Sequence, residues 1–219
     1  MILVRGLGRE GLVSLLCLIA FGVVAVLIDE HRIYSFDIHL IRFLQGMESP
    51  AMTRLMEAVS ASVRTKPVVV LALALMALLY FVFRHRWELL LVVAAIGGST
   101  LLNSLLKEAF ARERPSLHRI VEESGYSFPS GHSMAALSLY GVAVWLLWRH
   151  VKAGWGRALM LLVAAIIILA VGASRIYLGV HYPSDVIGGY LLSSSWLALS
   201  IGAFRRFAAR NATSPAVGS

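Results

Sequence analysis

Residues 107–115 read KEAFARERP, residues 129–132 read PSGH and residues 174–185 read SRIYLGVHYPSD. Each of these polar stretches lies at the end of a long apolar run. Ionisable side chains at the edges of apolar runs are expensive to keep in lipid and are therefore candidates for function. The pattern predicts that the three stretches meet at one face of a membrane.

The composition indicates a chain surrounded by lipid. Of its 219 residues, 58% are hydrophobic and only 15% are charged, and the mean hydropathy is +0.77. A soluble domain of this size carries about a quarter charged residues. Because no polar linker divides the chain, we expect one integral-membrane domain over residues 1–219, with its motif core at 107–185.

Charge and cysteine usage exclude several classes of protein. The net charge is +8, but the basic residues fringe the apolar runs, as membrane topology requires, so we expect no nucleic-acid partner. Cys17 is the single cysteine, which excludes a disulfide framework and a cysteine-based metal site. The sequence indicates no obligate protein partner.

Apolar runs predict the fold class. A membrane-spanning helix needs roughly 20 mostly apolar residues. Six runs reach or approach that length, so we expect an all-α, six-transmembrane-helix bundle. The runs are 11–28, 67–83, 88–106, 133–148, 155–174 and 185–204.

The first apolar run has two interpretations, a cleaved signal peptide or a retained anchor. It is long for a signal peptide and no small-residue cleavage site follows it, which favours an anchor. Six spans then put both termini on one side of the membrane. Lys and Arg are concentrated in the short segments of that side, which predicts that it is cytoplasmic and that the three polar stretches face outward.

Residues 29–66 form the first outer loop and are too polar to span. Apolar residues nevertheless recur there at helical spacing, as Leu40, Ile41, Leu44 and Met47 and as Met52, Leu55, Met56 and Val59, with Pro50 between the two sets. We expect two short amphipathic helices. They either lie in the membrane interface or cap the bundle.

The residue types in the polar stretches suit phosphoryl transfer, which requires cations around the phosphoryl oxygens, an in-line nucleophile and an acid for the leaving group. Lys107, Arg114 and Arg175 would supply the positive charge. Gly131 would let the backbone approach the phosphate, and Ser130 and the start of the fourth span would add donors.

Two histidines and one carboxylate complete the predicted site. His181 and Asp185 are four residues apart, so the carboxylate can orient the imidazole and leave its other nitrogen free to attack phosphorus. His132 would be the general acid and would later activate water. Arg112 could help to bind phosphate, but we expect it to be an ordinary exposed arginine, and we expect Ser184 to be the N-cap of the sixth span.

Two alternatives remain open from the residues alone. His132, His181 and Asp185 have the composition of a two-histidine, one-carboxylate metal site, although the neighbouring cations disfavour it. The polar residues could instead line a transport path for a lipid that is not hydrolysed.

The order K-x6-R-P, P-S-G-H and S-R-x5-H-x3-D resembles the type 2 phosphatidic acid phosphatase superfamily, and Lys107, Arg114, Pro115 and the residues of the other two blocks match it without departure. Its bacterial membrane members of the phosphatidylglycerophosphatase B type are similar in size. The resemblance implies hydrolysis of a lipid phosphomonoester or diphosphate without metal or other cofactor.

The resemblance also implies roles for individual residues. It makes His181 the nucleophile that carries a phosphohistidine, Asp185 its orienting partner and His132 the acid. The residues expected to contact phosphate are Lys107, Arg114, Ser130, Gly131, His132 and Arg175. Expected substrates are phosphatidylglycerophosphate, phosphatidate or undecaprenyl diphosphate, with lipid A as an alternative, in a bacterial inner membrane with the site on the periplasmic side.

Overall fold

The computed structural model describes residues 8–213, and all regular elements in this range are helices, which confirms the all-α prediction. In chain order they are α1 (Arg9–Asp29), α2 (Tyr34–Gln45), α3 (Pro50–Ala61), α4 (Thr65–Ala77), the π-helix η1 (Leu78–Val82), α5 (Glu88–Phe110), α6 (Gly131–Leu147), α7 (Gly154–Tyr177) and α8 (Pro183–Thr213).

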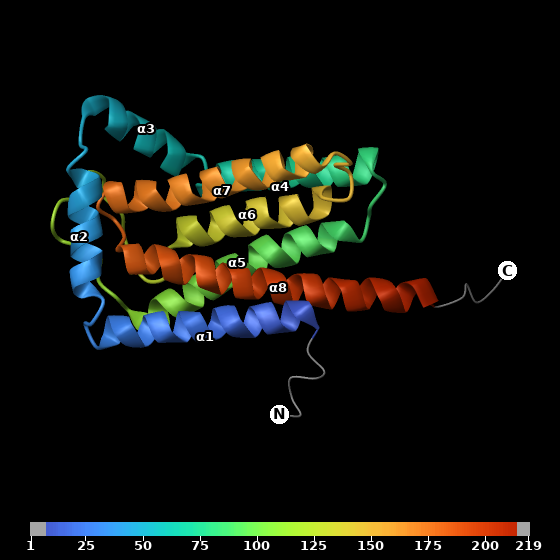
Figure 1. Cartoon of the computed structure of the whole chain (residues 1–219), viewed down its shortest axis with the longest axis horizontal. Coiled ribbons are helices and arrows are strands. Elements are labelled where there is room, and N and C mark those ends of the chain that lie inside the picture. Colours follow the sequence, from blue (N-terminus) through green and yellow to red (C-terminus); the bar gives the residue numbers. More distant parts are fainter. Residues whose placement is uncertain (1–7, 214–219) are drawn as a thin grey trace.

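The long helices lie side by side along the long axis of the molecule, and α2 and α3 cover one end (Figure 1). In the described part of the chain, five helical segments are long and apolar enough to cross a membrane: α1, α4 with η1, α5, α7 and α8. The expected count of six is therefore not fully met. The remaining helix, α6, is apolar but has only 17 residues.

The short length of α6 follows from its place in the bundle. It packs against α5, α7 and α8, and buries residues along its whole length. A helix of this size is about 26 Å long, somewhat less than the hydrocarbon core of a bilayer. Because its neighbours surround it, α6 does not have to match the membrane thickness on its own.

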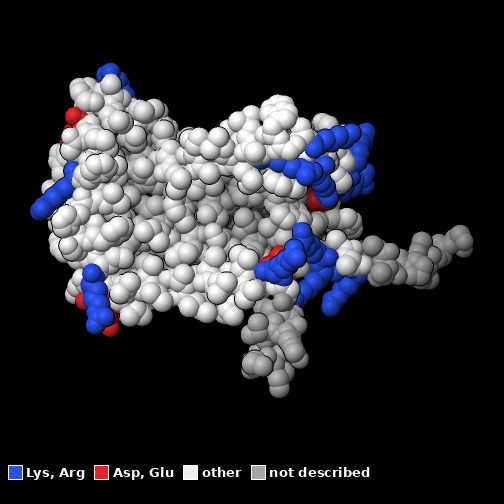
Figure 2. Space-filling model, in the orientation of Figure 1, with Lys and Arg blue, Asp and Glu red and all other residues white. Residues whose placement is uncertain are grey.

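Charged side chains gather at the two ends of the molecule and leave an uncharged belt between them on the face shown in Figure 2. Large apolar side chains of this belt are exposed, including Leu16 of α1, Val70 of α4, Leu101 of α5 and Leu169 of α7. A soluble protein rarely exposes such a continuous apolar surface. The chain is an integral membrane protein.

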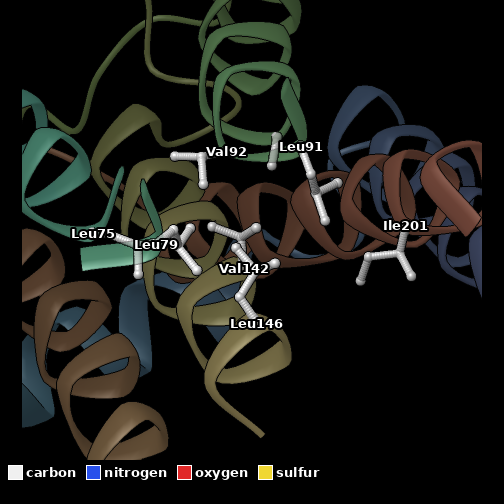
Figure 3. Close-up of a cluster of buried hydrophobic side chains, with 8 residues drawn as sticks. Leu75, Leu79, Leu91, Val92, Val142, Leu146 and Ile201 are labelled. Atoms are coloured by element: carbon white, nitrogen blue, oxygen red, sulfur yellow. The ribbon is translucent and has the colours of Figure 1, made fainter. Parts of the chain in front are cut away.

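A buried apolar cluster holds the bundle together at the end away from α2 and α3. Figure 3 shows side chains from α4, η1, α5, α6 and α8 pointing toward one another. Leu79, Val142 and Leu146 have no exposed surface. The opposite end contains the polar stretches instead, so the apolar cluster anchors a scaffold whose other end carries the chemistry.

The two short helices predicted in 29–66 are present, with Ser49 capping α3 through a 3.3 Å bond to the backbone N–H of Met52. Their predicted apolar stripes are only partly right. Met52 packs on the segment that follows α7, but Leu55 is 54% exposed and Met47 lies beyond the end of α2. A buried carboxylate, Asp37, occupies the inner face of α2.

Candidate active site

The three polar stretches converge at the end of the bundle that α2 and α3 cover. Lys107 lies in the last turns of α5, His132 in the first turn of α6 and Arg175 near the end of α7. His181 lies in the turn between α7 and α8, and Asp185 in the first turn of α8. Residues far apart in sequence thus meet where four helices begin or end.

A tight turn places His181 beside Asp185. Gly179 adopts a φ of +73°, a conformation that side chains strain, and a Cβ there would lie 2.0 Å from the carbonyl oxygen of His118. The backbone N–H of His181 then donates to the carbonyl of Arg175 at 3.3 Å. His181 Nδ1 lies 3.4 Å from Asp185 Oδ2.

The neighbours of His181 define its tautomer. Arg114 Nη1 lies 3.3 Å from His181 Nε2, and an arginine can only donate, so Nε2 must be the acceptor nitrogen. The ring proton then resides on Nδ1, which faces Asp185 and the hydroxyl of Ser127 at 3.3 Å. This tautomer leaves a lone pair on Nε2, as a nucleophile requires.

Burial lowers the pKa of His181 to about 4, although Asp185 opposes that shift. Desolvation penalises the charged imidazolium, since the side chain is almost fully enclosed. The imidazole is therefore neutral at physiological pH. A neutral ring that carries its lone pair on Nε2 is the reactive form for attack on phosphorus, once the bond from Arg114 gives way to the substrate.

Asp185 is held by more donors than His181 alone. Ser127 donates its hydroxyl to Oδ2, the backbone N–H of Tyr182 donates to the same oxygen at 2.8 Å, and Arg112 Nη1 donates to Oδ1 at 2.5 Å. The carboxylate is completely buried. These bonds satisfy both oxygens and leave the carboxylate little freedom to rotate away from the imidazole.

Arg112 also connects Asp185 to α2. Its Nη2 donates to Asp37 Oδ2 at 2.9 Å, and its Nη1 donates to the hydroxyl of Ser184 at 2.8 Å. Ser184 in turn donates to Asp37 through its hydroxyl at 2.6 Å and its backbone N–H at 2.8 Å. The expectation for Arg112 was wrong, because its side chain is mostly buried and paired with Asp37 and Asp185. The expectation for Ser184 was wrong as well, because α8 already begins at Pro183.

Burial raises the pKa of Asp37, against the opposing effect of the bonds from Ser184 and Arg112. A signal for this residue exists in the sequence. Asp37 shares a helix face with Ile38 and Ile41, and an acid within an apolar face is costly unless it is paired. The identity of its partner, however, depends on the chain returning 75 residues later.

Arg114 is engaged by backbone carbonyls on several sides. Its guanidinium donates to the carbonyls of Ser124, Gly125 and Val180 at 2.8–2.9 Å, and the side chain is buried. These bonds join the 124–125 loop to the turn that carries His181. Arg114 therefore holds this loop and this turn together, and it also lies beside His181, the candidate nucleophile.

Arg175 is almost fully buried and makes two side-chain bonds. Nη1 donates to the hydroxyl of Ser60 at 2.6 Å, and Nη2 pairs with the carboxylate of Glu123. Burial raises the pKa of Glu123, but the charge and hydrogen bond of Arg175 outweigh it and leave that pKa lowered. The third donor of Arg175, Nε, is buried and has no partner among the described residues.

Within residues 8–213, His132 also has a buried nitrogen without a partner, like the Nε of Arg175. Its Nε2 is buried without a hydrogen-bond partner in the described part of the chain. The ring lies within electrostatic reach of Arg175, Glu123 and His181. Buried polar groups are almost always satisfied, so two such donors in one site mark a position that suits a polar ligand.

The PSGH stretch starts α6 and is packed against α5. Ser130 is buried, its N–H donates to the carbonyl of Asp185 at 3.1 Å, and its hydroxyl accepts from Ser133 at 3.0 Å. A Cβ on Gly131 would lie 2.9 Å from Oδ1 of Asn103. A side chain at position 131 would crowd the amide of Asn103 on α5, a constraint that the motif alone does not reveal.

Lys107 is half-buried and lies within electrostatic reach of Arg114, Arg175, Glu123 and Asp185. It therefore borders the same cationic site as predicted.

The metal alternative fits less well. Within residues 8–213, no three His, Cys, Asp or Glu side chains form a group that could hold a metal ion, so His132, His181 and Asp185 do not make the expected ligand set.

Comparisons with known proteins bear on the family and the fold. Residues 87–208 match the model of the PAP2 superfamily. The chain is 34% identical over 176 residues to a protein from Bacillus subtilis (strain 168) called phosphatidylglycerophosphatase B. The matched region covers 78% of this chain and 85% of the relative.

Another relative and a solved structure extend the comparison. Undecaprenyl-diphosphatase BcrC of Bacillus subtilis (strain 168) is 30% identical over 106 residues, 46% of this chain and about half (49%) of that protein. The crystal structure of a transmembrane PAP2-type phosphatidylglycerolphosphate phosphatase from Bacillus subtilis superposes with a TM-score of 0.82 at 30% identity, over 88% of this chain and 96% of that one.

Proposed function

The chain belongs to the PAP2 superfamily, and from that premise we propose that this membrane lipid phosphatase acts through a phosphohistidine on His181. The substrate we propose first is phosphatidylglycerophosphate, because the relative of that activity is similar over most of this chain. Undecaprenyl diphosphate is the second candidate, because the similarity to the relative of that activity covers less than half of this chain.

The observation that carries the mechanism is the pair of unpartnered buried nitrogens, Nε2 of His132 and Nε of Arg175. Both belong to predicted phosphate contacts, and both lie near His181. A phosphoryl oxygen would accept from each of them. The negative charge of the phosphate would also favour the protonated form of His132, which the first step requires.

The first step forms a bond from Nε2 of His181 to phosphorus and breaks the bond from phosphorus to the leaving oxygen. His132 protonates that oxygen, so the dephosphorylated lipid, or the lipid monophosphate from a diphosphate, departs as a neutral or protonated group. Lys107, Arg114 and Arg175 offset the charge on the phosphoryl oxygens.

The second step uses water. His132, now neutral, removes a proton as the water oxygen attacks phosphorus, the bond to His181 breaks, and inorganic phosphate leaves. Asp185 keeps the Nδ1 proton in place throughout, because it is buried and held by several donors. We propose that no metal takes part, since the cations around the site would repel one.

Phosphate release in EDTA tests this proposal. Purified protein in neutral detergent should release phosphate from phosphatidylglycerophosphate, phosphatidate, undecaprenyl diphosphate or lipid A in excess chelator. His181→Ala should lose activity by several orders of magnitude. It should also trap no label from ³²P-labelled lipid in protein denatured with alkaline detergent, which preserves a bond between nitrogen and phosphorus, whereas the unmodified protein should be labelled. Activity that EDTA abolishes would overturn the metal-free mechanism, and lipid movement without phosphate release would support transport.

A further inference from the structure

A cavity of about 450 Å³ lies beside the proposed phosphate site, between α3, the end of α7 and the loop near Val121. Arg54 of α3, Arg64 just before α4 and the buried Arg175 all line it. It is therefore continuous, at Arg175, with the residues that would hold the scissile phosphate, but its other arginines belong to none of the three motifs.

The cavity carries more positive than negative charge. Arg54, Arg64 and Arg175 contribute three cations, and Glu57 is the acidic residue in the lining. In the described part of the chain, no ion pair joins Glu57 to Arg54 or Arg64. The charge of Arg64 acts on both His132 and Arg175, which places it near the reacting group.

Arg175 joins this cavity to the proposed phosphate site. Nε of Arg175 is buried and unpartnered although the side chain is only 1% exposed, and the same side chain lines the cavity. Ser60, which also lines the cavity, holds Nη1 of Arg175 at 2.6 Å and so orients its guanidinium. The scissile phosphate would accept from the open Nε donor, so a group attached to that phosphate would lie next to the cavity that Arg54 and Arg64 line.

We propose that Arg54 and Arg64 form a subsite for a second phosphate of the lipid substrate, adjacent to the phosphate that is hydrolysed. The inference rests on the proposed function and deepens it. The shared chemistry is an anionic phosphate group attached to the scissile one, either through a glycerol bridge, as in phosphatidylglycerophosphate, or directly, as in a lipid diphosphate. Phosphatidate has a single phosphate and cannot occupy the subsite.

The position of α3 gives this subsite a structural basis. α3 lies across the end of α7 and covers the site end of the bundle (Figure 1). Arginine presents donors in a planar fork that suits phosphate oxygens. The outer loop would thus select lipids by their second charge, while the motif residues bind the phosphate that all candidate substrates share.

Kinetics of matched variants test the subsite. Arg64→Ala and Arg54→Ala should each lower kcat/KM about tenfold for dioctanoyl phosphatidylglycerophosphate, for a short-chain lipid diphosphate, or for both, since each removes a charge-assisted contact. Their kcat/KM for dioctanoyl phosphatidate should stay within about twofold of the unmodified protein. Lys66→Ala removes a nearby exposed cation that does not line the cavity and serves as the control.

The comparison of the three lipids shows which kind of second phosphate the subsite binds. Loss confined to the diphosphate means that the subsite takes an adjoining phosphate, and loss confined to phosphatidylglycerophosphate means that it takes the bridged one; either result supports the proposal. Equal losses on all three lipids, losses matched by Lys66→Ala, or no loss would overturn it. If the unmodified protein hydrolyses none of them, the proposed function itself fails.

Discussion

At the scale of single residues, His181 combines features that sequence order does not convey. Its ring is enclosed, its Nδ1 faces a buried carboxylate, and its Nε2 faces a guanidinium that can only donate. Together these neighbours predict a neutral ring with a fixed tautomer. The chemistry assigned to the residue depends on that protonation state.

The pH dependence of His181 is therefore a first prediction. With a pKa of about 4, the ring should remain neutral at about pH 5.5, where an ordinary histidine is mostly protonated. NMR of ¹⁵N-histidine-labelled protein in detergent, between about pH 8 and pH 5.5, should show the His181 signal in its neutral form throughout.

His181→Gln assigns the signal by removing it. A midpoint near about 6.5 for that signal would mean that the pocket does not desolvate the ring, and the neutral nucleophile would lose its support.

At the scale of elements, α2 is connected through charged bonds to Asp185, the proposed partner of His181. Asp37 on α2 accepts from Arg112, and Arg112 donates to Asp185 at 2.5 Å. A helix that covers the bundle thus reaches the carboxylate that orients His181. The two interpretations of residues 29–66, a cap or an interfacial segment, do not include this connection.

Asp37→Asn is expected to act on turnover through this connection. The amide has one acceptor oxygen for the donors of Arg112 and Ser184, so Arg112 should hold Asp185 less firmly. We expect kcat to fall about tenfold with little change in KM, measured on protein that remains folded in detergent.

Asp29→Asn removes the same charge from the exposed end of α1 and is the control. A KM effect alone, or a lower melting temperature with unchanged kcat, would leave Asp37 with a purely structural role.

Also at the scale of elements, α8 packs closely against Phe128, the residue just before the PSGH stretch. A Cβ on Gly188 would lie 2.4 Å from the ring of Phe128, which is 1% exposed. Phe128 stacks on Phe21 at 5.4 Å and contacts Phe110 edge-on at 4.9 Å, so the ring has little space to move.

Gly188→Ala should consequently destabilise the protein by about 1–3 kcal/mol, the usual effect of overpacking a filled interior. Thermal unfolding in detergent should show the melting temperature falling. Gly97→Ala is the matched control, because no atom lies within 4 Å of a Cβ at Gly97 and alanine favours a helix. Equal melting temperatures for the two variants would contradict this prediction.

At the scale of the whole molecule, charge is divided between the two ends. The end opposite the site gathers basic side chains near the α4–α5 and α6–α7 connections and along the end of α8 (Figures 1 and 2). Basic connections of this kind mark the cytoplasmic side of membrane proteins. The site end would then face outward, as the sequence analysis predicts.

Cysteine labelling checks this orientation. In a Cys17→Ser background, Arg42→Cys on α2 and Lys152→Cys in the α6–α7 connection place single thiols at exposed positions of opposite ends. An impermeant maleimide should label Arg42→Cys on intact spheroplasts and Lys152→Cys only after lysis. The reverse pattern would place the site on the cytoplasmic side.

The sequence by itself determined the class of fold and the positions of the site. Apolar runs near the length of a membrane span predict helices, because lipid leaves backbone polar groups no other partner. Three motifs at span ends predict where the polar residues gather. These signals are local or depend only on successive spans crossing the membrane in alternate directions, so they can be read without knowledge of how the helices pack.

Only the tertiary structure decided which side chains support that chemistry. Asp37, Ser60 and Glu123 lie outside the motifs, yet they bond to Arg112 or Arg175 across separations of 52 to 115 residues. Local pattern contains no information on such partners, since they are chosen by how helices cross. The 17-residue length of α6 is tolerated for the same reason: its neighbours, rather than lipid, surround it.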